Sequence, residues 1–147
     1  MNWTTLLRFR KQVEDLAREE VVLAEWEKSQ KVSEREALGR EMEALVTELE
    51  YQIHLGMETL LAEERYRCLD QLGIAMEGRT EEIQTLEETL CRLREQLQKA
   101  YHARRVVELV IAKKEAEVLK RVAAQEQRLQ EDVSAHAFVT CHLEEMT

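Results

Sequence analysis

Apolar residues recur at alternating steps of three and four from Leu69 to Val118, and this spacing continues for seven heptads without a slip. A repeat of 3.5 residues stays on one narrow side of a helix only when that helix supercoils around a partner. The repeat comprises Leu69, Leu72, Met76, Arg79, Ile83, Leu86, Leu90, Leu93, Leu97, Ala100, Arg104, Val107, Ile111, Lys114 and Val118. This half of the chain therefore predicts one helix of a coiled coil, with its core at Leu69, Leu72, Ile83, Leu86, Leu90, Leu93, Leu97, Val107 and Ile111.

The first third of the chain carries a second, less regular apolar pattern. A helix is expected to begin near Thr4 or Thr5, where a hydroxyl can accept a hydrogen bond from a free amide of the first turn. Its apolar face is predicted to hold Leu6, Phe9, Val13, Leu16 and Leu23. The pattern weakens from Glu25 to Ala37, which predicts a register shift or a solvated stretch, and it resumes at Leu38, Met42, Leu45, Leu49 and Ile53.

The chain is expected to reverse direction between the two patterns. Gly56 can adopt the backbone conformation that ends a helix, and Thr59 can cap the next one. Gly73 and Gly78 fall inside the unbroken repeat and are placed within the second helix. The predicted elements are a helix over about 4–55, a turn over about 54–60, a helix over about 59–136 and a flexible C-terminal tail.

These elements predict an all-α fold, an antiparallel two-helix coiled-coil hairpin whose second helix is longer than the first. Residues 1–147 are expected to form one domain. In an antiparallel hairpin that turns near Met57, residue i faces roughly residue 114 − i. This pairing brings Arg8, Arg10 and Lys11 close to Arg104 and Arg105, so two basic segments are expected to meet at the open end of the hairpin.

Composition agrees with a thin, solvated fold. Charged residues make up 35% of the chain, against about 25% in a typical globular domain, and aromatic residues make up 5%. No apolar run approaches the length of a membrane span, and the N-terminal arginines are not followed by the apolar region of a signal peptide. Cys68, Cys91 and Cys141 are an odd number without metal or redox spacing, as expected for free thiols in a reducing cytoplasm.

Charge is distributed unevenly along this acidic chain. Its net charge is −9, but nine basic and four acidic residues between Arg92 and Arg121 give that segment +5 and leave −14 for the rest. Such a basic helix face is interpreted as a docking surface for an acidic protein, with an ordinary solvated face as the alternative. Nucleic-acid binding is disfavoured because the net charge is negative and Tyr101 is the only aromatic residue available for stacking there.

No catalytic or cofactor pattern is present in the sequence. The four glycines are scattered, without the clustering that a phosphate-binding loop needs. His136, Cys141 and His142 are close in sequence, but their spacing places them on different faces of a helix, so no metal site is predicted. Abundant carboxylates on a helix surface serve more often as partners for Lys or Arg than as acid–base pairs. We therefore expect no enzyme activity, no cofactor and no small-molecule ligand.

Several short segments resemble the flagellar export protein FliJ family. At the N-terminus these are Leu6-Leu7-Arg8-Phe9-Arg10-Lys11-Gln12-Val13 and Arg18-Glu19-Glu20. Further along, Tyr66-Arg67-Cys68-Leu69-Asp70-Gln71-Leu72, Ala103-Arg104-Arg105 and Gln125-Glu126-Gln127-Arg128-Leu129-Gln130-Glu131 are similar to segments of that family. Asp132 departs from the family's pattern, which leaves the virulence-type stalk proteins of the SctO/YscO group, with the same architecture, as an alternative.

The resemblance implies a non-enzymatic stalk or adaptor of a type III protein export apparatus. Its implied partners are a hexameric export ATPase (FliI-like), which it binds and stimulates, an export-gate protein (FlhA-like) and export chaperones. Its implied location is the cytoplasm, in peripheral association with the membrane-bound export apparatus. The residues assigned to the ATPase-binding end are Arg8, Phe9, Arg10, Lys11, Arg104, Arg105, Lys113 and Lys114. The alternative function is that of a generic structural or dimerising coiled coil in the cytoplasm.

Overall fold

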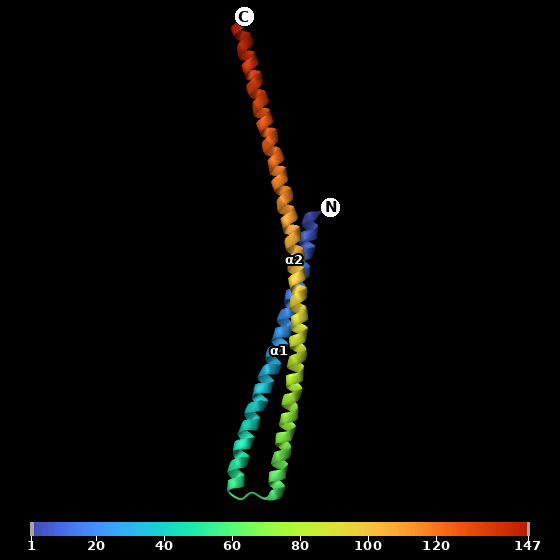
Figure 1. The fold of residues 1–147 in the computed structure, drawn as a ribbon, viewed down its shortest axis with the longest axis vertical. Helices are drawn as coiled ribbons and strands as arrows, with labels where there is room; N and C mark the ends of the chain where they lie inside the picture. The colour runs from blue at the N-terminus through green and yellow to red at the C-terminus, as the bar shows by residue number, and fades with distance from the viewer. Residues whose placement is uncertain (1, 147) are drawn as a thin grey trace. The chain divides into compact units, whose positions relative to one another are not determined.

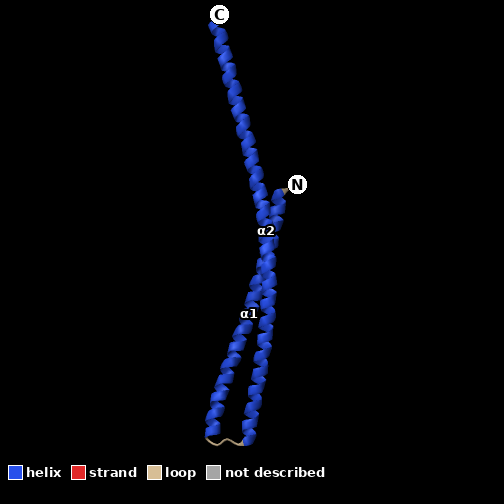
Figure 2. Ribbon diagram, viewed as in Figure 1, coloured by secondary structure: helices blue, strands red, loops and turns tan. Residues whose placement is uncertain are grey.

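The computed structural model describes residues 2–146, which form two helices, α1 (Trp3–His54) and α2 (Thr59–Met146). Within this range the chain contains no strand (Figure 2). The predicted all-α hairpin with a longer second helix is confirmed, since α1 has 52 residues and α2 has 88. The chain divides into two compact units, one formed by Gln12–Tyr101 and the other by the residues up to Lys11 together with those from His102. The expectation of a single domain stays a prediction.

The second helix begins at Thr59 as expected and the first within two residues of its expected start, but the capping residues differ. The Asn2 side chain caps α1, because its Oδ1 accepts a hydrogen bond from the Thr5 amide at 3.2 Å. Thr4 and Thr5 therefore lie within the first turn, where a capping hydroxyl has no role. At the start of α2 the Glu58 carbonyl accepts from the Ala62 amide at 3.0 Å, so Glu58 has the backbone role that was expected of Thr59.

The turn lies where the sequence places it. Gly56 has a φ of 89°. This left-handed conformation is unfavourable for residues that have a side chain, but it costs glycine little. The amides of Leu55 and Gly56 donate to the carbonyls of Tyr51 and Ile53 at 3.2 and 3.1 Å, which satisfies two carbonyls of the last turn of α1. Gly73 and Gly78 lie inside α2.

Within the unit formed by residues 12–101, α1 and α2 run side by side and pack through a thin apolar seam (Figure 1). Its best-packed part joins Val21 and Ala24 of α1 to Leu90 of α2, which is 2% exposed. Leu93 and Leu97 pack against this cluster. On α2 the seam follows the heptad series, with Ile83 and Leu90 buried and Leu69, Leu72, Leu86, Leu93 and Leu97 partly buried.

The buried face of α1 is not the one that its large apolar residues predict. Phe9, Leu16 and Leu23 were expected to share the buried face, and this was wrong, because they are 54%, 61% and 63% exposed. Glu14, Val21 and Ala24 are buried instead. Phe9, Leu16 and Leu23 are spaced by seven residues, and Glu14, Val21 and Ala24 by seven and three, so both sets fit one face of a helix and periodicity alone does not say which face meets α2. Small side chains at the contact allow two helices to approach closely, which favours the face that carries alanine.

Ion pairs between the helices replace apolar contacts in the weak middle of α1. Arg79 Nε lies 2.7 Å from Glu34 Oε2, and Lys31 Nζ lies 3.1 Å from Glu82 Oε2. Lys28–Glu87 and Arg94–Glu25 pairs continue the series at 3.4 and 3.2 Å. In each of these four pairs the two residue numbers add up to between 113 and 119, close to the sum of 114 that the antiparallel pairing predicts. This stretch of the seam is therefore charged and keeps its register.

The last part of α2 is longer and more exposed than expected. Helix continues past His136 to Met146, because this stretch contains neither glycine nor proline. A hydrogen bond from Thr140 Oγ1 to the His136 carbonyl at 2.9 Å adds local support. Every residue from 112 to 146 is exposed, so the heptad series is buried only as far as Ile111. Lys114 and Val118, which the series includes, lie on the surface.

Candidate partner-binding surface

All eight residues assigned to the binding end belong to the same compact unit, the one formed by residues up to Lys11 and from His102. We call the basic surface formed by residues 2–11 and 102–121 the basic end. It holds nine basic residues, and its acidic residues are Glu108, Glu115 and Glu117. The basic residues are Arg8, Arg10, Lys11, Arg104, Arg105, Lys113, Lys114, Lys120 and Arg121. This excess of positive charge stands out because the whole chain carries −9.

Trp3 connects the two segments of the basic end. The Lys114 ammonium lies 4.8 Å from the centre of the Trp3 ring, within the range of a cation–π interaction. The contact joins the first residue of α1 to an exposed position of α2. Sequence reasoning did not include Trp3 in the site, although the expected pairing of residue i with 114 − i placed it near Lys114. Buried Val107 lies in the same unit.

Arg104 and Arg105 have part of their charge neutralised by one carboxylate. Arg104 Nη1 lies 2.6 Å from Glu108 Oε1, and Arg105 Nη1 lies 2.9 Å from Glu108 Oε2. The Arg104 side chain is 19% exposed and the Arg105 side chain is 53% exposed. Arg105 therefore remains accessible to a partner, whereas Arg104 is mostly covered. Sequence reasoning missed this role of Glu108, although its spacing of four and three from the two arginines is typical of helix ion pairs.

The N-terminal residues of the basic end present both charge and an exposed ring. The Arg10 guanidinium carbon lies 5.9 Å from the centre of the Phe9 ring, and Arg10 is partly buried. Arg8 and Lys11 are exposed, as are Lys113 and Lys114 on α2. Ile111 is partly buried at the same level of α2 as these lysines. The surface therefore combines exposed cations with the accessible ring of Phe9.

Glu108 is expected to titrate below the ordinary carboxyl value of 4.5. Its pKa is lowered chiefly because Arg105 donates a hydrogen bond to it, and the hydrogen bond from Arg104 adds to the effect. A lowered pKa stabilises the folded state at pH values above the ordinary pKa, and this stabilisation is lost as the pH falls through the lowered pKa. In carboxyl-carbon NMR, the titration midpoint of Glu108 should lie below pH 4.5. It should rise in Arg105→Gln and remain unchanged in Arg128→Gln. A midpoint at or above 4.5 in the unaltered protein would contradict the ion pairs.

The remaining candidate residues lie near the end of α2. His142 stacks on Phe138 with ring centres 5.9 Å apart, and Cys141 is exposed. Across residues 2–146, no group of three or more His, Cys, Asp or Glu side chains is arranged to hold a metal ion. In the same range neither helix contains a stretch that is long and apolar enough to cross a membrane. Next to Lys114, Val118 and Leu119 line a shallow hollow on α2.

Comparison with known proteins identifies the family. The sequence model of the family described as flagellar FliJ protein matches residues 3–140, which is nearly the whole chain. The chain belongs to the FliJ family. This family of flagellar, export-related proteins was the one expected from the short segments around Phe9, Arg104 and Arg128. No curated protein and no solved structure gives a significant match.

The FliJ match covers both segments of the basic end. It begins at Trp3, the residue that contacts Lys114, and it extends through residues 102–121 to residue 140. The matched range therefore includes the exposed ring of Phe9 and the charged residues of both segments.

Proposed function

We propose that this FliJ-family protein is a non-enzymatic stalk or adaptor in flagellar protein export, and that its basic end binds and stimulates the hexameric export ATPase. The observation that carries the proposal is the collection of nine basic residues in one compact unit of an acidic chain. Because most of these cations are exposed, they add little to folding stability. They are available to steer an acidic partner and to hold it.

Three further parts of the proposal rest on family membership. The protein links the ATPase to the export-gate protein and to export chaperones, and it acts in the cytoplasm in peripheral association with the membrane-bound apparatus. Membership in the FliJ family supports this placement through its connection with flagellar export. The hairpin of residues 12–101 supplies a stiff helical body, which suits a spacer between two partners.

A binding measurement at two salt concentrations tests the docking mechanism. The intact protein, labelled at a native cysteine, is titrated with purified hexameric export ATPase, and ATP hydrolysis is measured on the same samples. We expect binding and stimulation at low salt and a loss of affinity of about tenfold or more at roughly 0.5 M salt, where the Debye length falls to a few Å. Salt-independent binding would overturn the electrostatic mechanism, and absence of binding at low salt would overturn the proposed function.

The alternative is a structural or dimerising coiled coil. It is favoured by the apolar residues of α2 that no other part of the described chain covers, namely Val118, Leu119, Val122, Leu129, Val133, Phe138, Val139 and Leu143. Sedimentation equilibrium of the free protein separates the two functions. A stable dimer that does not bind the ATPase would favour the alternative.

A further inference from the structure

About three consecutive turns of α1 expose large apolar side chains on the side of the helix that does not face α2. Leu16, Leu23 and Trp26 are 61%, 63% and 61% exposed, and Val22 borders them. We call these four residues the α1 stripe. Steps of seven and three place Leu16, Leu23 and Trp26 on one face of a helix with 3.6 residues per turn. Val21 and Ala24, in the same turns, face α2 and are buried.

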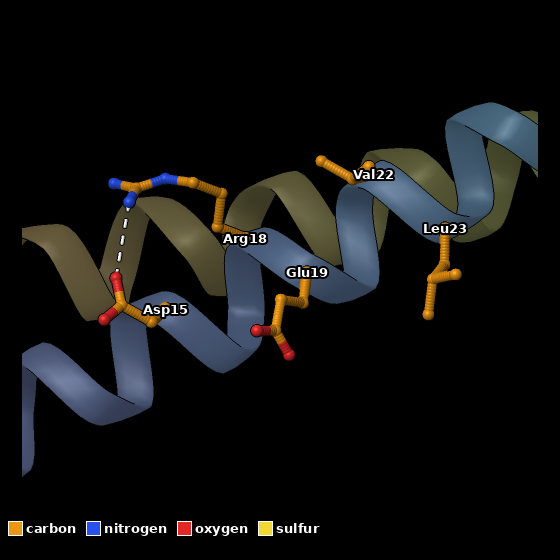
Figure 3. A pocket seen from close by; sticks show the side chains of 5 residues that line it. All are labelled: Asp15, Arg18, Glu19, Val22 and Leu23. Atoms are coloured by element: carbon orange, nitrogen blue, oxygen red, sulfur yellow. Dashed lines mark hydrogen bonds and ion pairs between the residues drawn. The ribbon is translucent and has the colours of Figure 1, made fainter.

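The arrangement gives α1 two separate apolar faces. Figure 3 shows the surface hollow lined by Asp15, Arg18, Glu19, Val22 and Leu23, with Glu19 and Leu23 pointing away from the α2 ribbon. A surface helix normally has one apolar stripe, which turns toward the core. Contiguous exposed apolar residues rimmed by polar ones are typical of interaction sites. The second face of α1 is therefore available to another helix.

Acidic residues surround the α1 stripe. Asp15, Glu19, Glu20 and Glu27 are exposed, and the last three make no ion pair within residues 2–146. The neighbouring bases are already engaged: Arg18 pairs with Glu14 and Asp15 at 3.0 and 3.4 Å, and Lys28 pairs with Glu87 of α2. The rim of the stripe therefore carries an excess of negative charge, because Arg18 offsets only Asp15 among these four carboxylates.

We propose that the α1 stripe is a docking face for a basic amphipathic helix of a partner protein. Apolar side chains of that helix at positions i, i+3 or i+4, and i+7 would cover Leu16, Leu23 and Trp26, and its lysines or arginines would face the acidic rim. A second copy of the α1 stripe is a poor occupant, because like charges would be brought together. An anionic lipid surface is a poor occupant for the same reason.

This inference goes beyond the proposed function and does not depend on it. The α1 stripe lies within residues 12–101, whereas the basic end belongs to the other compact unit and carries the opposite charge. One protein would then offer two surfaces of opposite sign, each selective for a different partner.

Two synthetic peptides test the inference with Trp26 as a native reporter. Trp3→Phe removes the other indole, and the full-length protein is titrated with an amphipathic leucine–lysine helical peptide and with its leucine–glutamate counterpart. We expect saturable binding and a blue shift of Trp26 emission with the lysine peptide, and at least about tenfold weaker binding of the glutamate peptide. Equal binding of the two peptides, or no binding of either, would overturn the proposal.

A matched pair of double variants locates the binding. Leu16→Gln with Leu23→Gln should weaken binding of the lysine peptide at least about tenfold. The helix content should not change, because both side chains are exposed. Leu129→Gln with Leu143→Gln changes two equally exposed leucines of α2 that lie outside the basic end, and it should leave the affinity for the lysine peptide unchanged. An equal loss in both variants would show nonspecific binding and overturn the proposal. Binding of the export ATPase should be the same in all three proteins, which separates this test from that of the basic end.

Two controls without the peptide identify other occupants. A shift of Trp26 emission that grows with protein concentration would assign the α1 stripe to a second copy of this chain. A shift on adding anionic phospholipid vesicles would assign it to a membrane surface. Either result would overturn the partner helix as occupant, and we expect neither.

Discussion

Leu90→Ala is expected to lower the free energy of unfolding by about 2–5 kcal/mol, the usual cost of a large-to-small substitution at a buried leucine. Leu90 is 2% exposed and packs against Val21 and Ala24, each of which is 7% exposed. A two-helix seam has no second layer that could compensate for the loss. Since whole domains are stable by about 5–15 kcal/mol, this change should remove a large fraction of the total.

Thermal unfolding followed by far-ultraviolet circular dichroism measures the effect. For a chain of this length, a loss of that size corresponds to a melting temperature lower by roughly 5–20 °C. Leu119→Ala is the matched control, because Leu119 is a leucine of the same helix that is 70% exposed, and it should change stability by less than about 0.5 kcal/mol. Equal melting temperatures for Leu90→Ala and the unaltered protein would show that the heptad does not form the seam.

The sequence predicts α2 better than α1 for a physical reason. In α2 the heptad positions from Leu69 to Ile111 are the partly buried and buried ones, since leucine, isoleucine and valine occupy most of them. In α1 the large apolar residues Leu16 and Leu23 repeat every seven residues, and so do Ala17 and Ala24 on the other side. Which of these two sets is covered depends on the packing against α2, and the structure covers the set with the smaller side chains.

The periodicity of apolar residues also did not predict the polar contacts at the seam. The weak pattern from Glu25 to Ala37 predicts a register shift or a solvated stretch. No residue of this stretch is buried, and pairs such as Arg79–Glu34 and Lys31–Glu82 join the two helices there. The pKa of Glu82 is lowered because Lys31 and Arg79 donate hydrogen bonds to it and lie close to it. Such pairs depend on the positions of side-chain ends across two helices, which one-dimensional spacing does not determine.

The sequence predicted which basic residues belong to the basic end, but it did not predict the side-chain contacts that these residues make. The antiparallel pairing assigns Arg8, Lys11 and Lys113 to one end, and all three belong to one compact unit. Sequence alone did not reveal that Glu108 holds Arg104 and Arg105, or that Trp3 contacts Lys114. Exposed cations that make no such contacts are the best residues with which to test the proposed function.

Replacing Arg8, Lys11 and Lys113 together by glutamate is expected to abolish ATPase binding at low salt. The triple variant reverses three exposed charges and alters no ion pair of the described chain. Folding should be little affected, because exposed charges contribute about 0–1 kcal/mol each. Association should slow and affinity should fall by at least about tenfold, because the surface would no longer attract an acidic partner.

The matched control reverses three exposed arginines outside the basic end, at Arg40, Arg67 and Arg128. Both triple variants have the same net charge, so a general effect of charge would weaken binding equally in both. We expect loss of binding and of ATPase stimulation only when Arg8, Lys11 and Lys113 are reversed, with identical circular dichroism spectra. Equal affinities for the two variants would refute docking through the basic end, because the position of the charges would then have no influence on ATPase binding.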